Sequence, residues 1–222
     1  MNITDLSYKA AVDSLTDLIT QNKSGIDDFK LKLYFDWITS KTEYLQKENQ
    51  AITIPDTQLP QTLSIQTYNY LKPKLKKIVN STYKKINDKY VRNTSRISVA
   101  ASTELFTTLY LSKRNVVWVD FGFNVGNEFG GRHPAVILKN LGEVLIVAPI
   151  STNSNGVEES DTIITFLPNE LYRMPSLRHR FTNITRITPV SLIRVDLNSN
   201  IGSMKATKFN EIIEKVKKYY EK

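Results

Sequence analysis

A glycine-rich stretch in the middle of the chain holds the residues best suited to chemistry. Two apolar runs, Val117–Phe121 and Ala135–Leu138, flank it, and their β-branched and aromatic residues predict strands. Glycine lets the backbone approach a ligand closely or take a positive φ, and the loop between the runs also carries cations. Such a loop, held between two rigid strands, suits the recognition of a phosphate group. Its notable members are Gly126, Glu128, Gly130, Gly131, Arg132 and His133.

Two later segments carry further groups of the same character. Ser151 and Thr152 end an apolar run and could hydrogen-bond a phosphate, although a serine at a strand end is otherwise a turn residue. A basic cluster follows, flanked by Tyr172 and Phe181, and basic residues interleaved with aromatics are typical of single-stranded RNA grooves. In the alternative interpretation these residues only solvate a loop before the last strand. The cluster consists of Arg173, Arg178, His179, Arg180 and Arg186.

Together these segments resemble three blocks of the MazF/PemK toxins, a family related to Kid and CcdB-like proteins. The first block resembles the family's G-x-E-x-x-G-x-R-P loop, the second its V-x-P-[ILV]-[ST] strand and the third its Q-I-R-T-I segment. Gly126, Glu128, Gly131 and Pro134 fall in register in the first block; the second block is Val147–Thr152 and the third is Asn183–Ile187. The resemblance covers about half of the chain, from Asn115 to Tyr220.

The resemblance implies an SH3-like small β-barrel, usually dimeric, that cleaves single-stranded RNA without metal or cofactor. The implied mechanism is attack of the ribose 2′-hydroxyl on the adjacent phosphate, which leaves a 2′,3′-cyclic phosphate and a 5′-hydroxyl. The catalytic candidates are Arg132, His133 and Ser151. The candidates for RNA contact are Glu128, Thr152, Arg178, His179, Arg180 and Arg186. The implied partners are single-stranded RNA, a cognate antitoxin and a second copy of the chain.

The chain departs from the family pattern just before the proline of the first block. His133 stands in the family's arginine position with Arg132 one place earlier, and Thr185 likewise stands ahead of Arg186 in the third block. Because adjacent strand residues point to opposite faces, a shift of one residue matters. Either the loop realigns so that Arg132 takes the catalytic role, or His133 is the acid–base group with Arg132 on the phosphate. The third alternative is an inactive site.

The composition excludes several classes of site. There is no cysteine, which excludes disulfides, thiolate zinc sites, iron–sulfur clusters and thiol nucleophiles. With His133 and His179 as the two histidines, a structural zinc site is not expected. No apolar run reaches the roughly 18–20 residues of a membrane span, and the first residues lack the pattern of a secretory signal. We therefore expect a cytoplasmic protein without a metal.

The net charge of +8 is concentrated in one stretch. From Lys72 to Arg96 there are nine Lys or Arg and one acid, Asp88, and nine minus one equals the whole excess. A local basic strip is what a polyanion would select, because each phosphate contact releases counterions. The alternative is a solvated helix face.

Residues 1–111 form the expected helical region. The predicted helices are Tyr8–Thr20, a segment from Asp27 with Phe29, Leu33, Trp37 and Ile38 at helical spacing, Tyr68–Tyr90 and Ala100–Leu111. Ala51–Leu63 contains two prolines and predicts a connector, and the polar Asn93–Ser98 predicts a break.

Residues 112–222 form the expected second domain, where the pattern changes to short strands. The predicted strands are 116–121, 135–138, 144–147, 162–167 and 181–187, and Met204–Tyr220 predicts a closing amphipathic helix. Five short strands predict a small barrel, so the fold class is α+β.

Three functions follow from this reading. The first is a toxin-type endoribonuclease held in check by an antitoxin. The second is an inactive module that binds RNA or protein, and the third is a CcdB-like inhibitor of a DNA-processing enzyme. The helical region could extend the RNA surface, form a dimer or dock the antitoxin.

Overall fold

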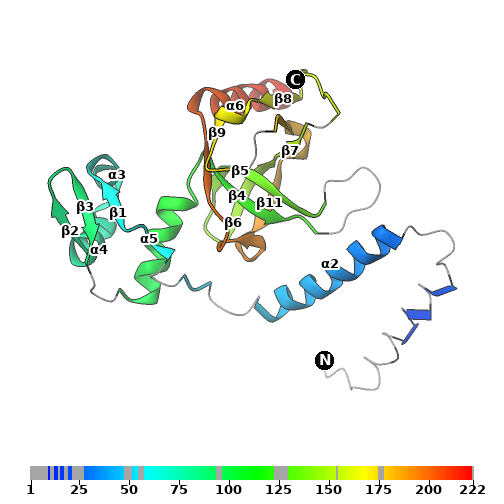
Figure 1. The fold of residues 1–222 in the computed structure, drawn as a ribbon, viewed down its shortest axis with the longest axis horizontal. Coiled ribbons are helices and arrows are strands. Elements are labelled where there is room, and N and C mark those ends of the chain that lie inside the picture. The colour runs from blue at the N-terminus through cyan, green and yellow to red at the C-terminus, as the bar shows by residue number, and fades with distance from the viewer. Residues whose placement is uncertain are drawn as a thin grey trace. The chain divides into compact units, whose positions relative to one another are not determined.

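The computed structural model describes residues 28–47, 52–54, 58–93, 97–122, 130–153, 155–174 and 178–221, with residues 10, 13, 14, 16, 17, 20 and 21 nearer the N-terminus. The chain divides into two compact units, Met1–Leu45 and Gln46–Lys222. Figure 1 shows the helices and strands of the two units, coloured along the chain.

The N-terminal unit is built on one long helix, α2 (Asp28–Lys47). Its start at Asp28 agrees with the expected helix from Asp27. Trp37 is half-buried, and the Lys41 ammonium lies 4.9 Å from the centre of its ring. The described residues between 10 and 21 are helical, as expected for Tyr8–Thr20, and the rest of that segment lies outside the described residues.

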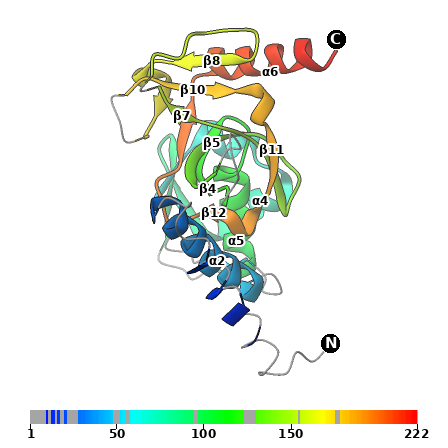
Figure 2. The same ribbon diagram turned by 90° about the vertical axis from the view of Figure 1, so that its right-hand side faces the viewer.

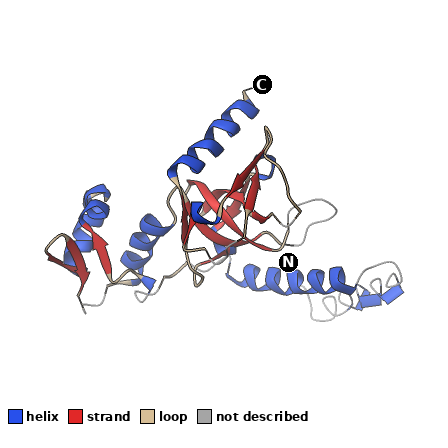
Figure 3. Ribbon diagram, turned by 45° about the horizontal axis from the view of Figure 1, so that its top comes forward, coloured by secondary structure: helices blue, strands red, loops and turns tan. Residues whose placement is uncertain are grey.

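The second unit begins with a small lobe of helices and strands over residues 58–93. Its sheet has the order β1 (Thr62–Ser64), β3 (Lys89–Arg92), β2 (Tyr83–Ile86), and all its pairs are antiparallel. Two short helices, α3 (Ile65–Tyr70) and α4 (Pro73–Thr82), accompany the sheet. Figure 3 shows this lobe on the other side of α5 from the main sheets.

The lobe corrects the prediction of a helix over Tyr68–Tyr90. The helical part ends at Thr82, and a β-hairpin follows whose turn holds Asn87 at a φ of 51°. Asparagine tolerates this left-handed conformation, so Asn87-Asp88 favours a turn. In the sequence, the helical spacing of the apolar residues hides this turn signal. Tyr83 starts the hairpin buried, and its hydroxyl donates to the Pro60 carbonyl at 2.8 Å. Burial raises the pKa of Tyr83 to about 12.

Helix α5 (Val99–Tyr110) connects the lobe to the main sheet and confirms the expected helix over Ala100–Leu111. The Ser98 side chain accepts from the Ala101 amide and caps its N-terminus. Leu105, Phe106 and Leu111 are buried in one core with lobe residues and one face of the main sheet. The lobe and the sheet therefore share a hydrophobic core.

The main sheet has the strand order β11-β6-β5-β4-β13-β9, and β12 also pairs with β4. Its strands are β4 (Asn115–Asp120), β5 (Arg132–Asn140), β6 (Val144–Pro149), β9 (Leu171–Tyr172), β11 (Thr188–Ser191), β12 (Val195–Asp196) and β13 (Gly202–Met204). A second sheet has the order β7-β10-β8, from Ser151–Thr152, Arg180–Asn183 and Ile163–Phe166. The fold is thus mixed helix and sheet.

The strand pairing of the main sheet is an open path. Among the described residues its outer strands, β11 and β9, do not pair with each other, so no closed barrel forms. The SH3-like barrel therefore stays a prediction. Four expected strands are confirmed, but 181–187 is only partly a strand, because Ile184–Arg186 forms a 3₁₀ turn after β10. Asn183 caps this turn by accepting from the Thr185 amide, which explains the interruption.

Helix α6 (Ala206–Tyr220) confirms the expected C-terminal helix. It buries Phe209 and Ile212 in a second core with alternate residues of the main sheet, such as Val116 and Val136. Figure 2 shows β8 and β10 beside α6. The main sheet is consequently covered on both faces, which makes the strands rigid supports for the groups at their ends.

Candidate active site

The glycine loop is closed at its base by β4 and β5. The Gly131 amide donates to the Gly122 carbonyl at 2.6 Å, and the Phe121 amide donates to the Gly131 carbonyl at 2.9 Å. Gly122 and Gly131 have φ values of 82° and 79°, which residues with a Cβ rarely adopt. The catalytic candidates Arg132 and His133 directly follow Gly131, so these hydrogen bonds fix the backbone from which their side chains project.

Arg132 lies on one face of β5, where it is held by three side chains. Its guanidinium donates to Asp196 Oδ2 at 2.6 Å and to Ser199 Oγ at 2.7 Å, and it lies 4.6 Å from the centre of the Trp118 ring. Its side chain is 51% exposed. The Asp196 carboxylate therefore offsets the charge that would otherwise be offered to a phosphate.

His133 lies on the other face of β5 and has a different environment. It is half-buried and forms hydrogen bonds with the backbone of Ile150 and Gly130. Burial lowers the pKa of His133, and the guanidiniums of Arg180 and Arg186 lower it further, against the two hydrogen bonds that raise it. The net direction is downward from 6.5, which favours the neutral form of the imidazole.

The two arginines that act on His133 come from neighbouring elements of the second sheet. Arg180 starts β10 and is only 7% exposed, and Arg186 ends the 3₁₀ turn and is half-buried. Burial lowers the pKa of Arg180, and the nearby Arg178 guanidinium lowers it further. Two guanidiniums, those of Arg180 and Arg186, thus act on one imidazole. A positive field of this kind favours a bound phosphate and a neutral histidine at the same time.

Ser151 and Thr152 form the short strand β7 next to this cluster. Ser151 directly follows Ile150, whose backbone bonds His133. Across the strand pair, Thr152 is opposite Arg180 and Ser151 is opposite Phe181. Residues opposite each other point to the same face, so Thr152 shares the face of Arg180.

The other candidates are placed in various ways. His179 is exposed, and its carbonyl accepts from the Asn153 amide at 2.8 Å. Thr185 is exposed, and its hydroxyl and its amide both donate hydrogen bonds to Asn183 Oδ1. The charge of Arg173 lowers the pKa of Tyr110 in α5, against the burial that raises it. Glu128 lies outside the described residues.

Three residues that matter here were not found from the sequence. Trp118, Asp196 and Ser199 hold Arg132, and the Asp196 carboxylate also accepts from the Asn198 and Ser199 amides. The Asp-x-Asn-Ser spacing signals a turn. Its contact with a side chain 64 residues away required the fold.

Two features are absent from the described part of the chain. It contains no group of three or more His, Cys, Asp or Glu placed to hold a metal ion. It also contains no helix that is long and apolar enough to cross a membrane.

Comparison with known proteins gives one family and several structures. The family model of the PemK-like, MazF-like toxins of type II toxin-antitoxin systems matches residues 112–220. The crystal structure of MazF (form I) from Deinococcus radiodurans is 16% identical, with 50% of this chain and 96% of that chain covered and a TM-score of 0.39. The MazE–MazF crystal structure (form II) from the same organism is 16% identical, with 50% and 97% covered and a TM-score of 0.37. No curated protein matches the chain.

Proposed function

Because residues 112–220 of this chain are a domain of the PemK-like, MazF-like toxin family, we propose that the protein is a toxin that cleaves single-stranded RNA. The cleavage proceeds without metal through the ribose 2′-hydroxyl. This is the reaction that the family resemblance implies. We take the domain to have the SH3-like fold of that family, with the open strand path described above, and residues 1–111 to be an accessory region.

The observation that carries the proposal is the position of His133 among arginines. A neutral imidazole beside Arg180 and Arg186 combines a proton acceptor with cations for a phosphate. Such a pairing supplies the two things that in-line attack at phosphorus requires: a base for the 2′-hydroxyl and positive charge for the phosphorane. Of the two alternatives at the shifted position, this supports His133 as the acid–base group. Arg180 and Arg186 then take the phosphate, in place of Arg132.

The reaction follows from these positions. His133 removes the proton of the 2′-hydroxyl, and the 2′-oxygen attacks phosphorus. Arg180 and Arg186 stabilise the negative charge that gathers on the equatorial oxygens, and a hydroxyl of Ser151 or Thr152 donates a hydrogen bond to one of them. The bond from phosphorus to the 5′-oxygen breaks, and that oxygen takes a proton from solvent. The products are a 2′,3′-cyclic phosphate and a 5′-hydroxyl.

The remaining RNA contacts and partners belong to the same proposal. Arg178 and His179 lie just before β10 and extend the surface along the strand of RNA. Glu128, which lies outside the described residues, stays a candidate for RNA contact. A cognate antitoxin restrains the enzyme, as the family description implies. The toxin acts as a homodimer in the cytoplasm, where its RNA substrate is.

The test is cleavage of several single-stranded RNAs by the purified protein in excess EDTA, followed by analysis of the product ends. We expect cyclic-phosphate and 5′-hydroxyl ends, made by the wild type and lost in His133→Ala. Cleavage that stops in EDTA would contradict the metal-independent mechanism.

A second candidate function is an inactive binding module. Binding of RNA without cleavage of any sequence would support this candidate and contradict the proposed one. The salt bridge of Arg132 to Asp196 is compatible with either function, so the decision rests on turnover.

A further inference from the structure

The small lobe at residues 58–93 carries almost all of the net charge of the protein. It contains eight Lys or Arg and one acid, Asp88, and eight minus one gives +7 of the total of +8. The basic residues are Lys72, Lys74, Lys76, Lys77, Lys84, Lys85, Lys89 and Arg92. The lobe also lies outside residues 112–220, so the toxin domain does not explain it.

Lys74 and Lys76 contact other side chains of the protein, whereas the adjacent Lys84 and Lys85 form no ion pair among the described residues. Lys74 pairs with Glu104 of α5 at 2.8 Å, and the Lys76 ammonium lies 5.4 Å from the centre of the Tyr68 ring. Lys84 and Lys85 are exposed on β2, and no carboxylate among the described residues forms an ion pair with either. Their charge is therefore available to an external anion.

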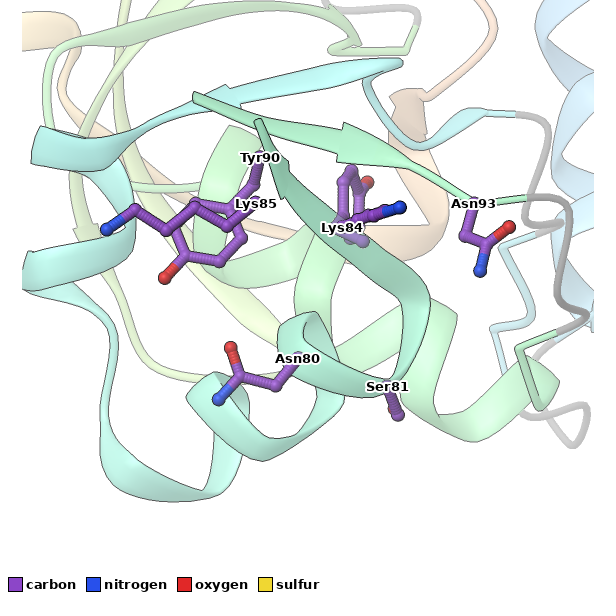
Figure 4. A pocket seen from close by; sticks show the side chains of 7 residues that line it. Asn80, Ser81, Lys84, Lys85, Tyr90 and Asn93 are labelled. Carbon is purple, nitrogen blue, oxygen red and sulfur yellow. The ribbon is translucent and has the colours of Figure 1, made fainter. Parts of the chain in front are cut away.

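The two lysines line a hollow of about 400 Å³. The last turn of α4 contributes Asn80 and Ser81, and Asn93 follows β3 (Figure 4). The remaining lining residues are Tyr83 and Tyr90. Ammonium, amide and hydroxyl groups donate hydrogen bonds, and no carboxylate lines the hollow.

We infer that this hollow binds a phosphate of the RNA backbone, outside the cleavage site. The inference rests on the proposed function for the identity of the polyanion. A hollow lined by cations and hydrogen-bond donors, without carboxylates, is suited to binding the phosphates of a nucleic-acid backbone. An acidic protein is a poorer fit, because the core of a protein interface is apolar and here Ile86 is the one exposed large apolar side chain on β2.

The first experiment measures binding without cleavage. The probe is a labelled oligouridylate in which every ribose is 2′-O-methylated, so that no 2′-hydroxyl can attack, and anisotropy gives the affinity over a range of salt concentrations. The test variant is Lys84→Gln/Lys85→Gln. The control is Lys217→Gln/Lys218→Gln, which removes two adjacent exposed lysines from α6, where they pair with Glu214 and Asp161.

The expected result is a change in the salt dependence. For single strands the slope of log affinity against log salt is about −0.7 for each phosphate contact, so losing the contact in the hollow reduces its magnitude by about 0.7. The control variant should keep the wild-type slope. An equal slope in test variant and wild type would overturn the inference and leave the two lysines as protection of an edge strand.

Two further measurements separate the explanations. Thermal unfolding shows whether the test variant folds as the wild type does, since cations after the C-terminal end of α4 also favour its dipole. Should it unfold early, Asn80→Asp places a negative charge in the same hollow, and RNA binding that is unchanged in this variant would overturn the inference. Loss of polyglutamate binding with an unchanged RNA slope would overturn it in favour of an acidic protein.

Failure of this inference and failure of the proposed function give different results. A protein that cleaves RNA normally, with an unchanged slope in the test variant, lacks the second site but is still the enzyme. A protein that cleaves nothing but loses slope in the test variant binds RNA through the lobe without the proposed activity.

Discussion

The two faces of β5 differ more than their neighbouring residue numbers suggest. On one face Arg132 is held by a carboxylate, a hydroxyl and an indole ring. On the other face His133 is half-buried beside the guanidiniums of Arg180 and Arg186. One face is locally neutral, and the other gathers positive charge around a neutral base.

The contrast between the two faces shows how a site can accommodate a shift of one residue. A strand presents alternate residues to opposite faces, so moving an arginine by one position removes it from its former face. Here the cations near the imidazole come from Arg180 and Arg186, which belong to other elements. Arg132 then has a structural role, because its hydrogen bonds to Asp196 and Ser199 hold the turn at Asp196 against β5.

The largest expected effect separates the two faces directly. We predict that His133→Ala lowers kcat for RNA cleavage by about 10²–10⁴-fold, the usual contribution of a general acid–base group. Arg132→Ala should change it by only about threefold, since an exposed ion pair contributes little. Rates under single-turnover conditions, with a 2′-O-methyl probe for binding, give the comparison.

The comparison breaks if the order reverses. A large loss in Arg132→Ala with full binding would mean that the guanidinium leaves Asp196 when RNA binds. Asp196→Asn distinguishes this case, because releasing Arg132 from its carboxylate would then raise the rate.

The next effect concerns the cations beside the imidazole. We predict that Arg186→Ala lowers kcat/KM by about 10²–10³-fold, as for removal of one group that stabilises transition-state charge. Its pH dependence should change as well. The base must be unprotonated, so kcat/KM falls as the pH drops through the pKa of His133, which lies below 6.5 in the wild type. Removing a guanidinium that lowers this pKa moves the acid limb to higher pH.

Arg132→Ala is the matched control for that pH profile. It removes the same charge from the opposite face of β5, where the guanidinium pairs with Asp196. An acid limb that moves equally in both variants would mean that net charge, not proximity to the imidazole, sets the pKa.

Part of this arrangement could be predicted from the sequence, and the reasons for the rest are physical. Alternation in Val116–Phe121 predicts β4, and spacing in the last residues predicts α6, because both patterns reflect burial on one face. The hairpin that begins at Tyr83 contradicts the predicted helix, since lysines at surface positions suit either period. The turn at Ile184–Arg186 depends on the Asn183 cap, so strand alternation did not apply to Arg186.

The grouping of the site needed the tertiary structure. The three sequence blocks locate Arg132, His133 and Ser151, but they do not say which arginine meets the histidine. That depends on the register of β10 with β7 and on the 3₁₀ turn after it. No local sequence pattern predicts the salt bridge between Arg132 of β5 and Asp196 at the end of β12, because the two residues are far apart in the chain.

A smaller effect distinguishes the two hydroxyls of β7. Thr152 shares the face of Arg180, whereas Ser151 shares that of Phe181. We predict that Thr152→Val lowers kcat/KM by about tenfold, the equivalent of one hydrogen bond to a charged group. Ser151→Ala should stay within about threefold under the same conditions. The opposite order would return the role to Ser151, as the family blocks imply.

The smallest effect tests the structural role of the Arg132 face. We predict that Asp196→Asn lowers the free energy of unfolding at pH 7 by about 1 kcal/mol, because the amide keeps the acceptor of the turn but loses the charge that binds Arg132. Burial alone would raise the pKa of Asp196, but hydrogen bonds from Ser199, Arg132 and the Asn198 amide outweigh it and lower the pKa below 3.8. A carboxyl with a lowered pKa stabilises the fold above its unfolded value, and this contribution disappears as the pH falls through the folded value. Urea unfolding at pH 7 and near pH 3 should therefore show a difference between wild type and variant that shrinks at the lower pH. A difference that persists in acid would assign the effect to packing of the turn, and the charge of Asp196 would then not be what holds Arg132 away from the other face.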